Sequence, residues 1–208
     1  MVQIPMPRMT EKELAEILTN AEKLINVSFS PEARIQVIRM SQGLPHFTHL
    51  IGLNAVRAAA GRRNRQVIGI DVQAAFSDAV AQSDQAVASA YSNAIHSAQP
   101  GAKYPQVLLA AAIAAFIDAD DYGYFQPSNL VGPMTIILGR QEEISGFNQH
   151  LSQFTEAKRG RVLERAGHPR SYRFRFAHPL LPPYVIMRSI RDKIVITEQV
   201  NKMLEIEL

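Results

Sequence analysis

Cysteine is absent from the 208 residues, which excludes disulfides, thiolate metal sites and a thiol nucleophile. This absence fits a reducing compartment, and we expect a cytoplasmic location. Long apolar runs are also missing. The longest, Val107 to Ile117, has eleven residues; this is too short to span a bilayer and predicts a buried helix. The opening MVQIPMPRMTEKEL lacks an apolar stretch after a charged start, so we expect no signal peptide and no membrane contact.

Motifs that carry their own chemistry are missing as well. The sequence has no G-x-x-x-x-G-K-[ST], and no glycine is followed directly by lysine, so this chain has no phosphate-cradling loop of its own. It has no G-x-S-x-G and no H-E-x-x-H. His46 and His49 are spaced to share a helix face, but no third ligand stands at suitable spacing. We therefore predict no metal site and no catalytic residue.

What remains is a helix-rich composition, with 47% hydrophobic residues, 20% charged residues and a net charge of +3. Apolar residues recur at helical spacing through the first hundred residues. Helix starts are predicted at Thr10, at Ser30–Pro31, at Pro45 and near Asp71, the last helix with a break near Ser83. These pieces predict a helical bundle over residues 1–99.

The stretch SAQPGAKYP marks the expected domain boundary, because it places two prolines and a glycine between periodic segments. Beyond it we expect a helix from Tyr104 to Ala119 and a short extended piece in DYGYFQPSNL. Two short helices then follow, at about Leu130–Leu138 and Ser145–Ala157, before a two-stranded hairpin. A closing helix is expected from about Pro183. This order is that of a winged helix-turn-helix domain, predicted over 100–190, with a helical tail over 191–208.

The hairpin concentrates positive charge. Between residues 158 and 175 seven basic residues face one acid, Glu164, a net charge of +6 that leaves about −3 for the rest of the chain. The basic residues are Lys158, Arg159, Arg161, Arg165, Arg170, Arg173 and Arg175. Strand alternation sends Tyr172, Phe174 and Phe176 to one face and two arginines to the other. This pattern fits a wing that grips DNA phosphates, and it also fits a solubilising edge hairpin or a site for an acidic protein.

The helix before the hairpin, SGFNQHLSQFTEAK, turns its apolar residues inward at helical spacing. Its polar residues then lie on more exposed faces; they are Asn148, Gln149, Ser152 and Gln153. Asn and Gln can pair bidentately with adenine in the major groove, and they are also common on solvent-facing helix surfaces. The helix carries little positive charge, so phosphate contact is better supported than base readout.

Two stretches of the first domain resemble a known family. QGLPHFTHLIGLNAVRAA, residues 42–59, resembles the third lid helix of AAA+ ATPases of the origin-recognition and replication-initiation branch. VQIPMPRMTEKELAEIL resembles the junction where the ATPase core enters the lid. The second half, from GYFQPSNL to PPYVIMRSI, resembles the winged-helix domain that follows the lid in bacterial ATPases of this type. The resemblance covers residues 2–190.

This resemblance implies that the chain is the C-terminal part of a longer ATPase, whose missing core binds ATP and Mg. It places His46 where such lids offer a sensor residue, usually arginine, to the γ-phosphate. A neutral histidine lacks the fixed charge of arginine, so sensing is weaker, pH-dependent, or assigned to His49 or Arg57. His46 can equally be a helix-start residue bonded to a carbonyl. Arg8, at the junction, is a further candidate for contact with the core.

Three functions follow from these observations. The first is a regulatory segment of an AAA+ ATPase, whose lid senses nucleotide and whose winged helix contacts double-stranded DNA. The second is an interaction module whose arginine-rich wing binds an acidic protein. The third is a free-standing winged-helix regulator. In each case the chain alone is expected to hold no cofactor and to catalyse no reaction.

Overall fold

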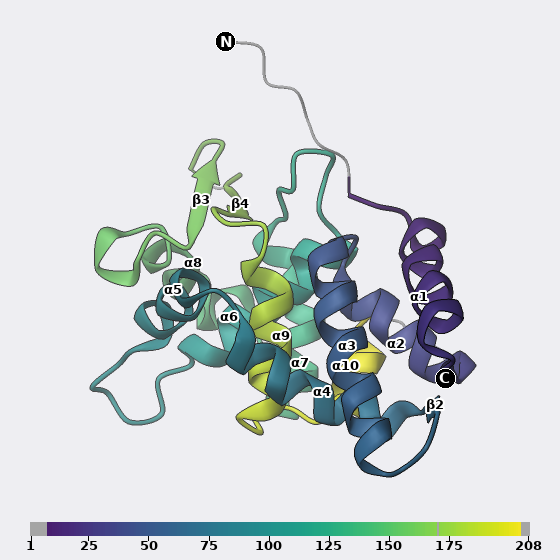
Figure 1. Cartoon of the computed structure of the whole chain (residues 1–208). Helices are drawn as coiled ribbons and strands as arrows, with labels where there is room; N and C mark the ends of the chain where they lie inside the picture. The colour runs from purple at the N-terminus through teal and green to yellow at the C-terminus, as the bar shows by residue number, and fades with distance from the viewer. Residues whose placement is uncertain (1–7, 170, 205–208) are drawn as a thin grey trace. The chain divides into compact units, whose positions relative to one another are not determined.

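A computed structural model describes residues 8–169 and 171–204 of the chain (Figure 1). These residues divide into two compact units, one up to Ala79 and the other from Val80 onward. Helices dominate both units, which confirms the expected mainly α class. The division falls within helix α4 (Gly69–Gln82), whereas the expected boundary was after residue 99. Helix α5 (Gln85–Ile95) belongs to the second unit because it packs on α6 (Tyr104–Ile117) and α9 (Leu181–Arg191).

Among the described residues, the first unit holds four helices and a pair of short strands. Its elements are α1 (Glu11–Ile25), β1 (Ser28–Phe29), α2 (Pro31–Ser41), α3 (Pro45–Gly61), β2 (Gln66–Val67) and most of α4 (Gly69–Gln82). The predicted helix starts are confirmed. The Thr10 hydroxyl accepts from the Glu13 N–H, and the Glu13 carboxylate accepts from the Thr10 N–H at 2.7 Å and from the Thr10 hydroxyl at 2.8 Å. The two bonds to the carboxylate favour its ionised form and lower the pKa of Glu13.

A parallel pair of two-residue strands joins distant parts of the first unit. Ser28 pairs with Gln66 and Phe29 with Val67, and the Ser30 N–H extends the ladder to the Val67 carbonyl at 2.8 Å. Phe29 and Val67 are buried. The sequence did not predict this pair, because two residues are too few to show an alternating pattern.

The predicted break near Ser83 lies close to the start of the second unit. Helix α4 ends at Gln82, and the Asp84 carboxylate caps α5 by accepting from the Ala86 N–H at 2.6 Å. The unit's longer helices are α5 (Gln85–Ile95), α6 (Tyr104–Ile117), α7 (Val131–Leu138), α9 (Leu181–Arg191) and α10 (Thr197–Met203). Within the tail expected to be helical, residues 192–195 form turns and bends, and α10 covers Thr197–Met203.

Helix α6 is the centre of the second unit. Every residue from Val107 to Ala114 is fully buried, as the apolar run predicts, and α6 packs on α5, α7 and α9. It ends at Ile117, two residues before the expected end. Such an all-round apolar helix needs neighbours on every side, and the surrounding helices provide them.

The expected helix over Ser145–Ala157 is wrong in extent. The structure has a six-residue helix α8 (Asn148–Gln153), flanked by 3-10 turns η2 (Ile144–Gly146) and η3 (Ala157–Arg159). Beyond α8, the Thr155 hydroxyl donates to the Ser152 carbonyl at 2.7 Å, and Glu156 is extended. A side chain that binds the backbone in this way competes with helix propagation, so periodicity alone overestimates the helix.

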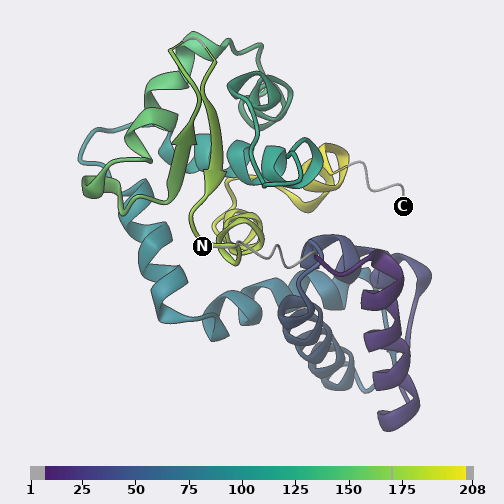
Figure 2. The ribbon, with the colours of Figure 1, turned by 90° about the horizontal axis from the view of Figure 1, so that it is seen from above.

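The hairpin is present as predicted. Strands β3 (Leu163–Ala166) and β4 (Arg173–Phe176) pair antiparallel, from Leu163 opposite Phe176 to Ala166 opposite Arg173, and run side by side in Figure 2. The short extended piece before the 3-10 turn η1 (Pro127–Leu130) is also present. Phe125 forms a bridge to Phe174, with N–H to carbonyl bonds of 2.8 Å in both directions. The order of the second unit is thus helix, bridge strand, two short helices, hairpin and closing helix.

Candidate nucleic-acid interface and lid turn

Strand β4 sorts its side chains by face. Phe174 is 1% exposed in the core, and the Phe176 ring, half-buried, lies 6.3 Å from the Phe125 ring. Arg173 is exposed and Arg175 half-buried. The predicted division between an aromatic face and an arginine face therefore appears in the strand, because a pleated backbone alternates its side chains.

The two strand arginines already contact carboxylates. Arg173 Nη1 lies 2.9 Å from Asp120 Oδ2, and Arg175 Nε lies 2.6 Å from Glu164 Oε2. Both guanidinium groups lie over the Tyr124 ring, at 4.6 and 4.9 Å from its centroid. The hydrogen bond that Arg175 donates to the Glu164 carboxylate raises the pKa of Arg175. The wing charge is therefore partly balanced by acids that lie next to it.

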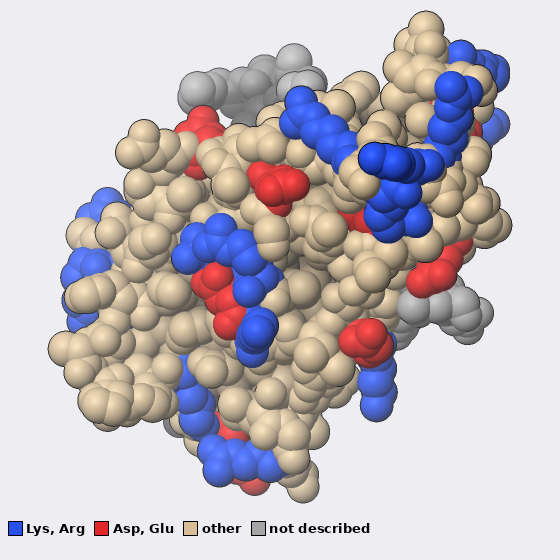
Figure 3. Space-filling view, turned by 60° about the horizontal axis from the view of Figure 1, so that its bottom comes forward, with Lys and Arg blue, Asp and Glu red and all other residues tan. Residues whose placement is uncertain are grey.

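The other predicted phosphate ligands divide into three groups. Lys158 is exposed and pairs with Glu156 at 2.9 Å. Arg161 and Arg165 are exposed, and the Arg165 guanidinium lies 4.5 Å from the Tyr172 ring centroid. Arg170 lies outside the described residues. On the face shown in Figure 3, basic side chains stand in separate groups, several with acidic side chains beside them.

Arg159 has a different environment from the other cations. Its Nη1 donates to the carbonyls of Ala94 and His96, and its guanidinium lies 3.5 Å from the centroid of the Tyr104 ring. It joins the loop after α5 to the start of α6. These contacts make Arg159 a bridge between elements of the second unit.

Helix α8 presents only part of its predicted polar surface. Asn148 and Gln149 are exposed, whereas Ser152 and Gln153 are half-buried. The Tyr104 hydroxyl donates to Gln153 Oε1 at 2.6 Å, so Gln153 is already engaged within the unit. Asn148 and Gln149 are the residues of this set that face outward.

A cleft of about 780 Å³ lies between the start of α8, the start of η1 and the wing turn. Two of the predicted DNA-binding residues line it, Asn148 from α8 and Arg173 from the hairpin. Tyr172, next to Arg173, also lines it. The remaining lining residues are Gln126, Pro127, Ser128, Ile144, Gly167, Pro169 and Ser171. None of these lining residues is acidic, and amide, hydroxyl and guanidinium groups alternate with apolar surface. Such a cleft suits an anionic or sugar-bearing ligand.

The turn before α3 is held by the segment that enters α1. Gly43 has a φ of +73°, and a Cβ at this position would lie 2.6 Å from the Arg8 Cβ. Arg8 Nη1 donates to the Gln42 carbonyl at 2.5 Å, and the Met9 N–H donates to the Gly43 carbonyl at 3.0 Å. Glycine is needed here for both the left-handed backbone and the close approach of the chain.

The candidate sensor residues lie along α3. His46 is exposed in the first turn, with its ring edge-on to Phe47 at 5.3 Å. Arg57 is exposed and donates to Asn54 Oδ1 at 3.3 Å, three turns further along the helix. The structure thus places Arg8 and His46 at the same turn and Arg57 away from it.

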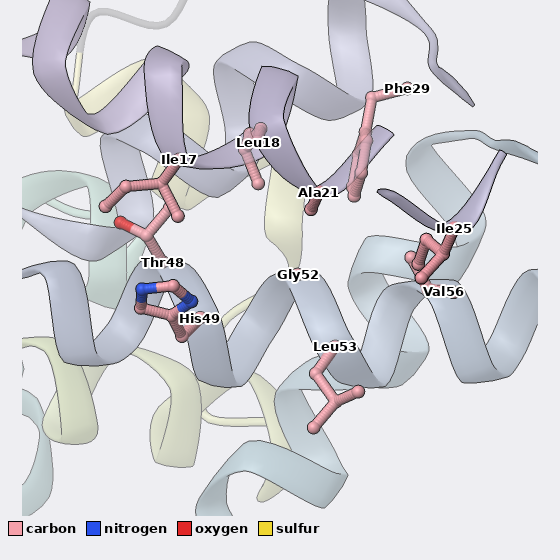
Figure 4. Close-up of a pocket in the computed structure, with 10 residues that line it drawn as sticks. All are labelled: Ile17, Leu18, Ala21, Ile25, Phe29, Thr48, His49, Gly52, Leu53 and Val56. Carbon is pink, nitrogen blue, oxygen red and sulfur yellow. The ribbon is translucent and has the colours of Figure 1, made fainter. Parts of the chain in front are cut away.

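His49 lines an apolar pocket of about 260 Å³ between α1 and α3 (Figure 4). Ile17, Ala21 and Ile25 face it from α1, and Thr48, Gly52, Leu53 and Val56 from α3. The helices approach closely at Gly52, where a Cβ would meet Leu18 at 3.2 Å. His49 therefore belongs to an apolar wall rather than to the turn that holds Arg8.

Sequence reasoning missed the acidic and aromatic partners of the wing, Asp120 and Tyr124. Asp120 lies 53 positions before Arg173 in the sequence, and the Phe125–Phe174 bridge brings this segment to β4. The signal was the acidic run DADD directly before the predicted extended piece. Because Phe125 pairs with β4, the residues just before Phe125 in the sequence lie beside β4.

Two further findings concern the described residues only. No helix in residues 8–169 and 171–204 is long and apolar enough to cross a membrane. Within the same residues, no three histidine or acidic side chains come together in a group able to hold a metal ion.

Comparison with known proteins gives one structural likeness. No family model and no curated protein matches the sequence. The crystal structure of Cdc6p from Pyrobaculum aerophilum aligns with 90% of this chain and 50% of its own, with a TM-score of 0.35 and 12% identity. The chain thus spans half the length of that protein.

Proposed function

We propose that this chain is the regulatory, DNA-contacting segment of an AAA+ ATPase. The observation that supports DNA contact is the acid-free cleft on the second unit, where Asn148, Tyr172 and Arg173 converge from a helix and a hairpin. The order of elements in this unit, with a bridge strand beside the hairpin, agrees with a winged helix. In that fold the helix enters a groove while the wing follows the phosphates.

The residues assigned to each role follow from their exposure. Arg173, Arg175, Arg165, Arg161 and Lys158 are the phosphate ligands, and Asn148 and Gln149 face the base edges. Arg159 and Gln153 support the interface from within, because their polar groups bind partners in the same unit. Phosphate contacts then supply most of the affinity, and base contacts add a smaller preference.

Nucleotide would reach this chain only through a core that supplies the phosphate loop. The sequence has no such loop, and the lid turn offers a neutral imidazole at His46 and a guanidinium at Arg8 that is bonded to the Gln42 carbonyl. When bound to such a core, ATP and Mg would supply the charge that the lid turn reads. His46 and Arg8 would then bias the lid position, a population shift rather than chemistry. The isolated chain is expected to hydrolyse no ATP.

The test of DNA contact is a titration of the purified chain with labelled duplex at several salt concentrations. A phosphate-gripping wing loses affinity steeply with salt, with a log–log slope of several units. Absent binding at low salt, or binding with a flat salt dependence, contradicts the proposal. An unlabelled single strand of the same composition serves as the competitor that measures preference for duplex.

One observation favours a second candidate, an acidic protein partner. Arg173 and Arg175 already bind carboxylates, and a partner's Asp or Glu side chains offer the same chemistry. Under this alternative, acidic peptides would compete with duplex DNA for the chain. Weak DNA binding together with saturable binding of a polyglutamate peptide would favour it.

A further inference from the structure

The loop from Asp118 to Tyr124 is the most acidic segment beside the wing. Its sequence, DADDYGY, places three carboxylates within four residues, at positions 118, 120 and 121. The bridge between Phe125 and Phe174 fixes the end of this loop to the middle of β4. An acidic loop is thereby held against the strand that carries Arg173 and Arg175.

Asp120 is held in a fixed orientation by its own loop. Its Oδ1 accepts from the Tyr122 N–H at 3.0 Å and from the Tyr124 N–H at 2.9 Å. Its backbone N–H donates to the Tyr124 carbonyl at 2.9 Å. The second oxygen, Oδ2, is left to accept from Arg173 Nη1 at 2.9 Å. The loop therefore presents one carboxylate oxygen to the wing at little further cost in side-chain entropy.

Glu164 repeats this arrangement from the other strand. It is the register partner of Arg175, and its Oε2 accepts from Arg175 Nε at 2.6 Å. Tyr124 lies under both guanidinium groups and holds them side by side. The two outward arginines of β4 are thus each oriented by a ring face and each occupied by a carboxylate. A guanidinium binds phosphate oxygens with the donors it uses for a carboxylate.

We propose that Asp120 and Glu164 act as internal phosphate mimics, which occupy the wing arginines until a polyanion displaces them. This inference rests on the proposed DNA contact and adds a regulatory device to it. The arginines stay preformed over Tyr124, so DNA binding exchanges one anion for another without reordering the wing. An isolated anion gains little by this exchange, whereas a duplex offers adjacent phosphates to both arginines at once.

The test measures duplex affinity of the full chain at one moderate salt concentration for matched charge-neutral variants. Asp120→Asn keeps the Oδ1 acceptor for the loop and removes the charge that faces Arg173. Glu164→Gln does the same for Arg175 and lies outside the loop. Asp121→Asn is the control: it removes the same charge from the same loop, and Asp121 makes no ion pair within the described residues.

We expect Asp120→Asn and Glu164→Gln each to tighten duplex binding about threefold to fivefold, because each frees one arginine from an exposed pair. Asp121→Asn should change affinity less than about twofold, since salt screens a charge without a direct partner. In an Arg173→Ala background the gain from Asp120→Asn should shrink to that of the control. Glu164→Gln should still increase affinity in that background, because it acts on Arg175.

The outcomes separate the inference from the function it rests on. If the original chain binds duplex with the expected salt dependence but Asp120→Asn and Glu164→Gln gain no more than Asp121→Asn, the two acids are structural only and the inference is wrong. A gain from Asp120→Asn that persists without Arg173 would also overturn it. If neither the original chain nor any variant binds duplex at low salt, the proposed DNA contact is refuted. The proposed role of Asp120 and Glu164 as phosphate mimics is then refuted as well. Thermal melts identify a variant that fails to fold, and Glu164→Gln then decides alone.

Discussion

Arg159 and Arg173 come from the same basic segment, yet the structure uses them differently. Arg159 donates to two backbone carbonyls, of Ala94 and His96, and covers the Tyr104 ring. Arg173 is exposed and binds the side-chain carboxylate of Asp120. Ala94 and His96 stand at the end of α5, so their backbone carbonyls are held in place by the chain, whereas an exposed carboxylate side chain can turn away and give its place to a phosphate. The kind of partner, more than the density of charge, therefore separates the arginine that joins elements of the unit from the arginine that we propose to contact DNA.

The largest effect is expected at the residue that anchors the strand of Arg173. Replacing Phe174 by Ala should reduce the free energy of unfolding by about 3–5 kcal/mol, because the ring is fully buried and its loss leaves a cavity. Chemical denaturation measures this loss. Phe176→Ala is the control, and it should cost less since that ring is half-buried. A loss below about 1 kcal/mol for Phe174→Ala would contradict its place in the core.

The comparison predicts that Arg159 contributes more to the free energy of unfolding than Arg173 does. Arg159→Ala should reduce the free energy of unfolding by about 1–3 kcal/mol, because two carbonyls lose a charged donor and Tyr104 loses its cover. Arg173→Ala should change it by less than about 1 kcal/mol, as exposed ion pairs contribute little. Denaturant melts of both variants, with exposed Arg161→Ala as reference, provide the measurement. If both variants lost the same free energy of unfolding, Arg159 would not be more structural than Arg173.

For DNA binding, we expect the arginines of β4 to matter more than Arg159. Replacing Arg173 and Arg175 together by Ala should weaken binding to all duplex sequences alike and lower the log–log salt slope by at most about two units. Fluorescence anisotropy against two unrelated duplexes at several salt concentrations measures both quantities. A change confined to one duplex would indicate base readout by the wing.

The smallest effect is a pH dependence of stability at His150, which contacts the same Tyr104 ring as Arg159. Burial lowers the pKa of His150, and the charges of Lys103 and Arg159 lower it further. The unfolded chain then binds more protons than the folded chain, so stability should rise with pH up to about the ordinary imidazole value of 6.5 and level off above it. Thermal melts between about pH 5 and 8 test this against His150→Gln. In Arg159→Ala the dependence should be weaker, and an unchanged dependence would exclude the contribution of Arg159.

Sequence reasoning reached the helices, the hairpin and the sorting of β4 because these depend on local periodicity and caps. Thr10, Ser30 and the aromatic–arginine alternation carry their structural consequence within a few residues. The extent of α8 was missed because Thr155 ends the helix through a bond that periodicity does not register. The same limit applies to the candidate site: the acid that pairs with Arg173 stands fifty-three positions earlier in the chain.

The distribution of the predicted site residues shows the same limit. Helical spacing placed Gln153 and Asn148 together on exposed faces, but the Tyr104 hydroxyl reaches Gln153 from another helix. The net charge of +6 treats every basic side chain between residues 158 and 175 alike. In the structure, however, the Arg159 guanidinium donates to backbone carbonyls. Which group a side chain binds depends on the tertiary structure, so it can be read only once the helices and strands are placed beside one another.

The two-residue strands β1 and β2 close a loop that contains all of α2 and α3. Neither helix can leave its place without breaking the ladder at Phe29 and Val67 or carrying both ends along. Local opening in this part of the chain should therefore involve the two helices together, as one cooperative segment with similar amide-exchange protection. A displacement of the turn between them, at Gly43, should therefore move α2 and α3 together.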